Sequence, residues 1–522
     1  MTATSRGLPL RPPSPASAAR PAPRRAWLTV LILSMSLLMI GLDNTILNVA
    51  LPTLQRSLSA TSTQLQWTVD AYLLAFAGLL LAAGNLGDRI GRRRVLQAGL
   101  VIFGAGSALA ALSGTAGQLI ASRAVMGAGG ALIMPSTLSV ITYIFDGGQR
   151  ARALAVWTAV AGIGIALGPV TGGFLLSHYW WGSIFLVNVP IAVLTLIAGL
   201  FLIPESRDPD AGRADPLGVV LSIAGLLSLV YGVIEAPTNG WTGPVTLTAF
   251  AAAAVLLAIF AAWELRSSHP MLRLHLFRNR RFSAASATIA LAFLALFGAL
   301  FFLTQYLQLV LGYSPLQAGA RTVPVAAGLL TGSVLSTPAT RLLGTKLVVA
   351  AGMLLAAGGL GVLTTLTPAS GYGAVLAALL LAGTGIGVAM PPATDSVMGS
   401  LPLAKASVGS AMNDTARLVG AAFGVAIMGT TISEVYAARV GAVTAHLPAP
   451  AAAPVRGSLQ AALRVAQLLG GPRGHALQAA ARQAFTDAMS RAALIGVGVT
   501  LAAALVALVL LPARAPGHAA RS

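Results

Sequence analysis

The stretch GNLGDRIGRRRVLQ, residues 84–97, decides the fold of this chain because it sets one carboxylate and four arginines between two apolar runs. The runs at 65–84 and 95–114 each have roughly the 20 residues that a helix needs to cross a bilayer. Glycines at Gly84, Gly87 and Gly91 permit a tight turn and a close approach of two helices. We therefore predict a cytoplasmic turn at the membrane surface between two spanning helices.

The composition excludes a soluble globular protein. Of the 522 residues 56% are hydrophobic and 9% charged, whereas about 25% charged is usual in soluble domains. The apolar runs predict about fourteen spans, near residues 27–50, 65–84, 95–114, 118–145, 153–176, 183–203, 215–235, 244–264, 282–310, 316–340, 346–366, 371–398, 407–432 and 490–512.

The net charge of +19 follows the membrane topology and does not indicate a nucleic-acid partner. Arginines gather before the first span and in the link before 282, as the positive-inside rule predicts for cytoplasmic segments. The first apolar run is too long for the core of a cleaved signal peptide, so we expect it to be retained as a span. The absence of cysteine excludes disulfides and thiolate metal sites.

A degenerate second copy of the charged turn, ATRLLGTKLVVAAG at 339–352, indicates a duplicated chain, although chance similarity between two polar links is the alternative. Transporters built from internal repeats have this organisation. The predicted parts are a cytoplasmic tail (1–26), a six-helix bundle (27–203), an inserted helix pair (204–281), a second six-helix bundle (282–512) that includes a long external loop (433–489), and a final tail (513–522). Within that loop, apolar residues at helical spacing predict short surface helices.

Three ionisable residues lie inside predicted spans, where a charge is costly unless it is paired or lines a wet cavity. Asp43, Asp70 and Arg123 all lie roughly 7–11 Å deep when counted at about 1.5 Å per residue from the outer helix ends. An ionic cluster across three helices is therefore possible, with Arg123 holding one carboxylate while another takes up a proton. The alternative is a static ion pair that only fixes helix packing.

Glycines in the fifth predicted span form a helix-contact surface. In GIGIALGPVTGGF, residues 162–174, Gly164, Gly168 and Gly172 recur at intervals of four. Pro169 removes an amide donor and clashes with the carbonyl of Ile165, so a kink is expected there.

The charged turn resembles the signature loop of the major facilitator superfamily. The Gly-x-x-x-Gly-Pro-x-x-Gly-Gly pattern resembles the motif of that superfamily's antiporters, and together with Leu42-Asp43-x-Thr45 and Arg123 the chain resembles its fourteen-helix drug:proton antiporters. The resemblance implies an all-α integral membrane fold of two six-helix bundles plus two inserted helices. It also implies a cytoplasmic gate at Gly84, Asp88, Arg89, Gly91, Arg92, Arg93, Asp146 and Arg152, proton coupling at Asp43, Arg123 and, less firmly, Asp70, and an antiporter helix at Gly164, Gly168, Pro169, Gly172 and Gly173.

A substrate cavity is expected where polar side chains face the bundle interior. Asn44 and Asn48 lie on a polar stripe of the first span, and Gln305, Tyr306 and Gln308 form a polar aromatic patch in the ninth. Anchoring in the interfacial aromatic belt is the alternative for Tyr306.

These features predict proton-driven export of lipophilic small molecules across a bacterial cytoplasmic membrane, by a monomer that needs no cofactor or metal and has protons and membrane lipid as its other partners. Lipid flipping or uptake on the same fold is the alternative, and the glycine-proline motif argues against uptake. A membrane enzyme or respiratory subunit would need nucleophiles or ligands, and none of the six histidines is at ligand spacing within a span.

Overall fold

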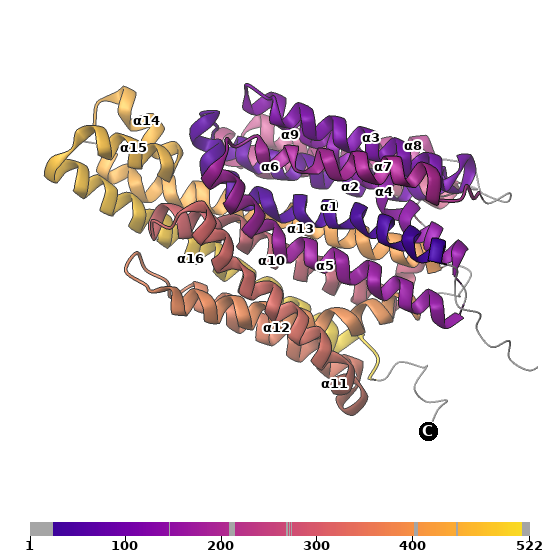
Figure 1. Cartoon of the computed structure of the whole chain (residues 1–522). Coiled ribbons are helices and arrows are strands. Elements are labelled where there is room, and N and C mark those ends of the chain that lie inside the picture. Colours follow the sequence, from indigo (N-terminus) through magenta and orange to yellow (C-terminus); the bar gives the residue numbers. More distant parts are fainter. Residues whose placement is uncertain are drawn as a thin grey trace, which may run out of the picture.

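The computed structural model describes residues 24–145, 147–207, 215–267, 270, 272, 274–400, 406–444 and 447–513. Within these ranges the chain is helical and forms no strand, which confirms the expected all-α membrane architecture (Figure 1). The first half contains α1 (Arg24–Ser57), α2 (Ser62–Ile90), α3 (Arg92–Ala111), α4 (Ala116–Ile144), α5 (Gly147–His178), α6 (Ser183–Leu186) and α7 (Asn188–Leu202).

The inserted pair is α8 (Pro216–Asn239) and α9 (Pro244–Arg266), followed by the short helix η1 (Leu274–Arg278). The second half contains α10 (Arg280–Gln305), the π-helical turn η2 (Tyr306–Val310), α11 (Pro315–Leu363), α12 (Tyr372–Met398), α13 (Ala406–Thr444), α14 (Ala449–Gly457), α15 (Leu459–Leu469) and α16 (Gly471–Leu510).

By length and composition, 11 helices of the described chain can cross a membrane, or up to 12 if the bent α2 is one span. The prediction of about fourteen is slightly higher because α11 combines two predicted spans and because the described apolar part of α5, Gly162–His178, is shorter than a span. Helix α11 has 49 residues and breaks at Gly344, whose φ of 81° is closed to most side chains. This break lies inside the degenerate repeat of the charged turn.

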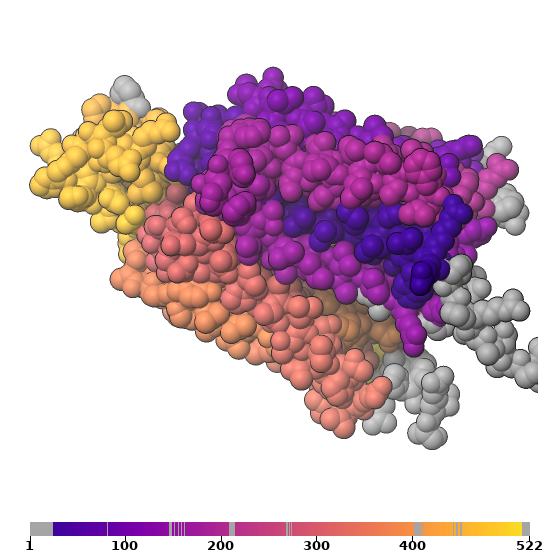
Figure 2. All heavy atoms as spheres, in the orientation of Figure 1, coloured from indigo at the N-terminus to yellow at the C-terminus, as the bar shows by residue number. Residues whose placement is uncertain are grey.

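Two helices continue into the segment 433–489, where the sequence predicts only short surface helices. The carboxyl end of α13 and the amino end of α16 both run beyond the predicted membrane boundaries. The amino end of α16 remains helical because its apolar residues at helical spacing, Leu477, Ala481 and Ala488, are buried on one face of the helix. The amino end of α16 forms an outer cap with α14 and α15. This cap, defined here as residues 447–489, stands at one end of the molecule (Figures 1 and 2).

The two halves meet along two helix pairs, α5 against α11 and α2 against α13. The inserted α8 packs on α2 and α13, whereas α9 packs mainly on α8 and has only 17% of its most apolar window buried. In Figure 1, α11 and α12 diverge from α5 toward the end of the molecule opposite the cap.

Glycines make the outer contact between α5 and α11 tight. A Cβ atom at Gly173 would lie 2.6 Å from the Cα of Leu316, and one at Gly319 would collide with the carbonyl oxygen of Pro169. At the inner part of α5, a Cβ at Gly162 would meet nothing within 4 Å. The contact between α5 and its surroundings is therefore tighter at Gly173 than at Gly162.

We predict that Gly319→Val destabilises the fold by about 1–3 kcal/mol, because the new side chain overpacks the backbone of α5. Gly358→Val on the same helix is the matched control, since its Cβ would meet nothing within 4 Å. Denaturant unfolding in detergent micelles measures the difference. Equal midpoints for the two variants would contradict the tight contact.

Candidate functional site

Helix α1 presents three different faces to its surroundings. At 100° per residue, Asp43, Asn44 and Thr45 point in three directions, and Asn48 shares the face of Asn44. Asp43 turns toward α4, Asn44 and Asn48 line a central cavity, and Thr45 contacts α5. One helix thus joins a charge, a cavity and a packing contact.

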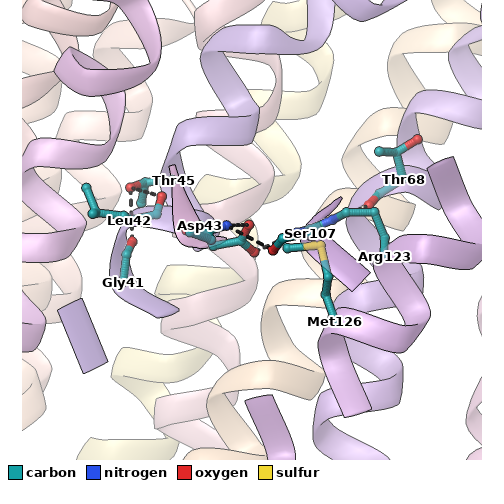
Figure 3. Close-up of polar contacts among 9 residues, drawn as sticks. Gly41, Leu42, Asp43, Thr45, Thr68, Ser107, Arg123 and Met126 are labelled. Carbon is teal, nitrogen blue, oxygen red and sulfur yellow. Dashed lines mark hydrogen bonds and ion pairs between the residues drawn. The ribbon is translucent and has the colours of Figure 1, made fainter. Parts of the chain in front are cut away.

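Asp43 and Arg123 form a buried ion pair between α1 and α4. The Nη1 of Arg123 lies 2.6 Å from Oδ2 of Asp43, and the two residues are 1% and 0% exposed (Figure 3). Asn188 of α7 donates from Nδ2 to the other carboxylate oxygen at 3.2 Å. A buried pair is tolerated when additional hydrogen bonds satisfy its remaining oxygens and protons, and Asn188 supplies one that the sequence analysis did not predict.

Arg123 also reaches α2. Its Nε donates to the carbonyl of Thr68 at 3.2 Å, and its guanidinium carbon lies 4.2 Å from the centre of the Tyr72 ring. Such a cation–π contact adds stabilisation where the cation is desolvated. Arg123 therefore ties α1, α4 and α2 together, as the shared depth of these residues suggested.

Asp70 lies outside this cluster. It is 0% exposed, and neither of its carboxylate oxygens has a hydrogen-bond partner among the described residues. The structure thus brings together Asp43 and Arg123 but leaves Asp70 separate on α2.

The glycine-proline motif of α5 accommodates Thr45. Because Pro169 has no amide hydrogen, the carbonyl of Ile165 loses its helical donor, and the Thr45 hydroxyl lies 3.1 Å from that oxygen. A Cβ at Gly168 would collide with this hydroxyl. Gly164 and Gly172 lie against Leu38 and Ile46 of α1 in the same way, whereas Gly173 lies against α11.

In the predicted gate, Arg92 pairs with Asp88 one turn earlier, with Nη2 at 2.8 Å from Oδ1. Gly91 has a φ of 120°, which glycine adopts without strain. Gly84 is in ordinary contact with Pro135, and Arg89 and Arg152 are exposed. Asp146 lies outside the described residues.

Glu205 contacts the predicted gate, and the sequence analysis missed it. Its Oε1 accepts from the backbone N–H of Arg93 at 3.2 Å, and its Oε2 lies 3.5 Å from Nε of Arg94. The carboxylate therefore caps the amino end of α3, where Gly91 offers no side chain. Its only sequence signal was an acidic residue directly after the sixth span.

The central cavity has a volume of about 250 Å³ and lies between the two halves. Its walls are mostly aliphatic and aromatic, with Phe76, Phe293 and Phe297 among the larger side chains. The lining comes from α1, α2, α4, α5, α10, α11, α12 and α13, so both halves contribute. A cavity of this kind suits a lipophilic ligand.

One charged pair, Asp414 and Arg417, lines the cavity. Their closest charged atoms are 3.9 Å apart, a loose contact, and the guanidinium of Arg417 lies 5.3 Å from the ring centre of Phe293. Asn413 is 3.5 Å from Asp414 and hydrogen-bonds weakly with Thr394. The acidic oxygens of Asp414 are thus only partly engaged.

The polar patch expected on the ninth span lies outside this cavity. Gln308 donates to the carbonyl of Val49 at 2.8 Å, and the buried Tyr306 donates to the carbonyl of Thr367 at 2.8 Å. Gln305 faces a separate small cavity under the outer cap. The π-helical turn η2 interrupts the α-helical spacing of side chains from Tyr306 onward. The spacing of apolar residues in the sequence did not predict this turn.

Comparison with known proteins gives the family from sequence and the fold from solved structures. Residues 33–425 match the model of the Major Facilitator Superfamily. The multidrug efflux pump LfrA of Mycolicibacterium smegmatis is 38% identical over 93% of this chain and 96% of its own, and the tetracenomycin C resistance and export protein of Streptomyces glaucescens is 33% identical over 95% and 93%.

Among solved structures, an inward-facing, unoccupied bacterial homologue of the human lysosomal transporter Spinster superposes with a TM-score of 0.64. It is 19% identical, covers 93% of this chain and 98% of its own, and shows the fold. With its many apolar helices and bacterial relatives, the chain is a multi-pass protein of the cytoplasmic membrane. This chain belongs to the major facilitator superfamily of membrane transporters.

Proposed function

We propose that this transporter exports lipophilic small molecules in exchange for protons by alternating access. The observation that carries the proposal is the double role of α1, which holds the buried Asp43–Arg123 pair on one face and lines the apolar cavity on another. The named relatives are efflux and resistance proteins, which supports export as the direction. The chain needs no cofactor in this scheme, and one subunit holds the complete cavity.

Proton binding at Asp43 weakens the pair because it removes the negative charge that faces Arg123. Arg123 then keeps its contacts to Thr68 and Tyr72 on α2, and α2 packs against α13 across the interface of the halves. On its other side, α1 contacts Ile165 and Gly168 of α5, whose outer end packs against α11. Both interfaces between the halves thus respond to the charge state of Asp43.

The substrate binds in the central cavity by apolar contact, and Asn44 and Asn48 offer hydrogen bonds from α1. The carboxylate of Asp414 is only loosely paired with Arg417, so it offers cationic compounds a charged contact in the second half. The cytoplasmic gate at Asp88, Arg92 and Arg93, held by Glu205, controls the opening on the inner side.

The function is tested in everted membrane vesicles, whose acidic lumen corresponds to the outer side of the cell. A pH-sensitive dye follows the lumen while lipophilic antibiotics, cationic dyes and lipids are added in turn. Antiport predicts compound-triggered loss of the proton gradient with the native chain and none in vesicles without it. Transport that leaves the gradient unchanged would refute proton coupling, and a response to lipids alone would refute drug export.

We predict that Asp43→Asn abolishes compound-triggered proton release and also destabilises the fold by about 3–5 kcal/mol, since Arg123 is left buried without a counter-charge. The double variant Asp43→Asn/Arg123→Gln should recover most of the stability but none of the proton release. Unfolding in micelles and the vesicle assay separate the two effects. Proton release by the stable double variant would remove this pair from the coupling mechanism.

We predict that Asp414→Asn raises the KM for cationic substrates about tenfold and changes the KM for neutral substrates little, because it removes a charge-assisted contact of about 1.4 kcal/mol. Asp395→Asn is the control, as Asp395 is exposed on α12 and does not line the cavity. Transport rates over a concentration series of a cationic and a neutral dye measure the effect. Equal shifts for both dyes would contradict a charge-selective role.

A further inference from the structure

A second, smaller cavity lies under the outer cap, between the two halves. Its walls come from the outer parts of α1, α2, α10 and α13, and Leu459 and Phe485 of the cap close it. Its volume is about 30 Å³. A buried water needs about 10–15 Å³, so the cavity has room for about two waters and is far smaller than the central cavity.

Several polar side chains line this cavity. Gln55, Gln66, Gln305 and Ser433 contribute side chains. Gln66 is 1% exposed, and its Oε1 has no hydrogen-bond partner among the described residues. A buried amide oxygen without a partner costs about 1–3 kcal/mol, which a bound water relieves.

Asp70 lies one helical turn deeper than Gln66. Residues four apart share a helix face, and helical side chains lean toward the amino end of their helix. For α2 that end is the outer one, so the carboxyl group of Asp70 leans toward the turn that carries Gln66. Two buried groups with unpartnered oxygens thus follow one another inward from the cavity.

The charged groups on the helices around α2 do not contact Asp70 at ion-pairing distance. Asp43 and Arg123 pair with each other, Glu434 of α13 accepts from Trp241, and Arg439 of α13 lies near Asp487. The other charged groups are Arg56 of α1, the inner Arg92, Arg93 and Arg94 of α3, Glu235 of α8, and Asp414 and Arg417 of α13. One turn outward on the face of Asp70, the polar side chain is Gln66, which lines the cavity.

We propose that the cavity beneath the outer cap is a hydration site through which protons from the outer side reach Asp70, with the Gln66 amide as the bridging group. The inference rests on the proposed proton-coupled function and adds Asp70 to it as a second carboxylate that takes up a proton in each cycle together with Asp43. A proton leaves a hydrated site in the cavity and joins a carboxylate oxygen of Asp70, forming a neutral carboxyl group; no other bond changes. The cavity would thereby separate the proton route from the apolar substrate cavity.

Hydroxyl-radical footprinting of the native transporter tests the hydration directly, because radicals formed from trapped water label the side chains around it. A third cavity of about 20 Å³ is the internal control, since only Ala, Val, Leu and Ile line it and apolar cavities of this size stay dry. We expect Phe301 and Phe485 to be labelled several-fold faster than Leu303 and Leu360, each normalised to its rate in the unfolded chain. Equal normalised rates would overturn the proposal.

Two variants test the proton route. Gln66→Met keeps the side-chain volume and removes the amide. Gly429→Ala places a methyl group against the Gln66 amide, whereas the control Gly498→Ala meets nothing within 4 Å. We expect both Gln66→Met and Gly429→Ala to slow compound-triggered proton release in everted vesicles about tenfold, the rate equivalent of about 1.4 kcal/mol, with unchanged binding of a labelled substrate.

The outcomes separate this inference from the function on which it rests. A native chain that moves protons, together with unchanged rates in both variants, overturns the route and leaves antiport standing. A native chain that moves no protons refutes the proposed function, and the route fails with it even where footprinting finds a wet cavity.

Discussion

The buried ion pair between Asp43 and Arg123 is the constraint on which the rest of the structure depends. Neither charge is stable at this depth without the other, so α1 and α4 are held at a fixed distance. Asn188 brings in α7, and the contacts of Arg123 bring in α2. A change in one proton on Asp43 therefore alters the balance of forces among four helices, which suits the pair for coupling chemistry to a movement of the bundle.

Two prolines create polar contacts between α1 and the helices beside it. Each intramembrane proline leaves a carbonyl without its helical donor, and in the membrane that carbonyl needs another partner. Pro52 frees the carbonyl of Asn48, to which Thr304 of α10 donates at 2.7 Å. Pro169 frees the carbonyl of Ile165 in the same way, and Thr45 lies at its oxygen. These contacts link α1 to the other half and to α5, and they are weak enough to break and reform.

Much of the fold was predictable from the sequence because bilayer thickness sets the length of each apolar run. Shared depth predicted that Arg123 would hold one carboxylate, and the structure shows that this carboxylate is Asp43 and not Asp70. The sequence did not predict those features that depend on contacts between residues far apart in the chain. Glu205 and Asn188 act across long sequence separations. Tyr306 and Gln308 bond to backbone carbonyls and Gln305 faces the small cavity, so this polar patch lies outside the central cavity. The long helices α13 and α16 extend beyond the predicted spans, where their ends pack against α14 and α15 of the cap.

The direct test of the account is proton release by the purified transporter when a substrate binds. A pH indicator in weakly buffered detergent solution reports the protons released per bound substrate. The account predicts release by the native chain and its loss in Asp43→Asn/Arg123→Gln, which should still bind the substrate in its apolar cavity. Undiminished proton release from that double variant would contradict the claim that the buried pair couples protons to transport.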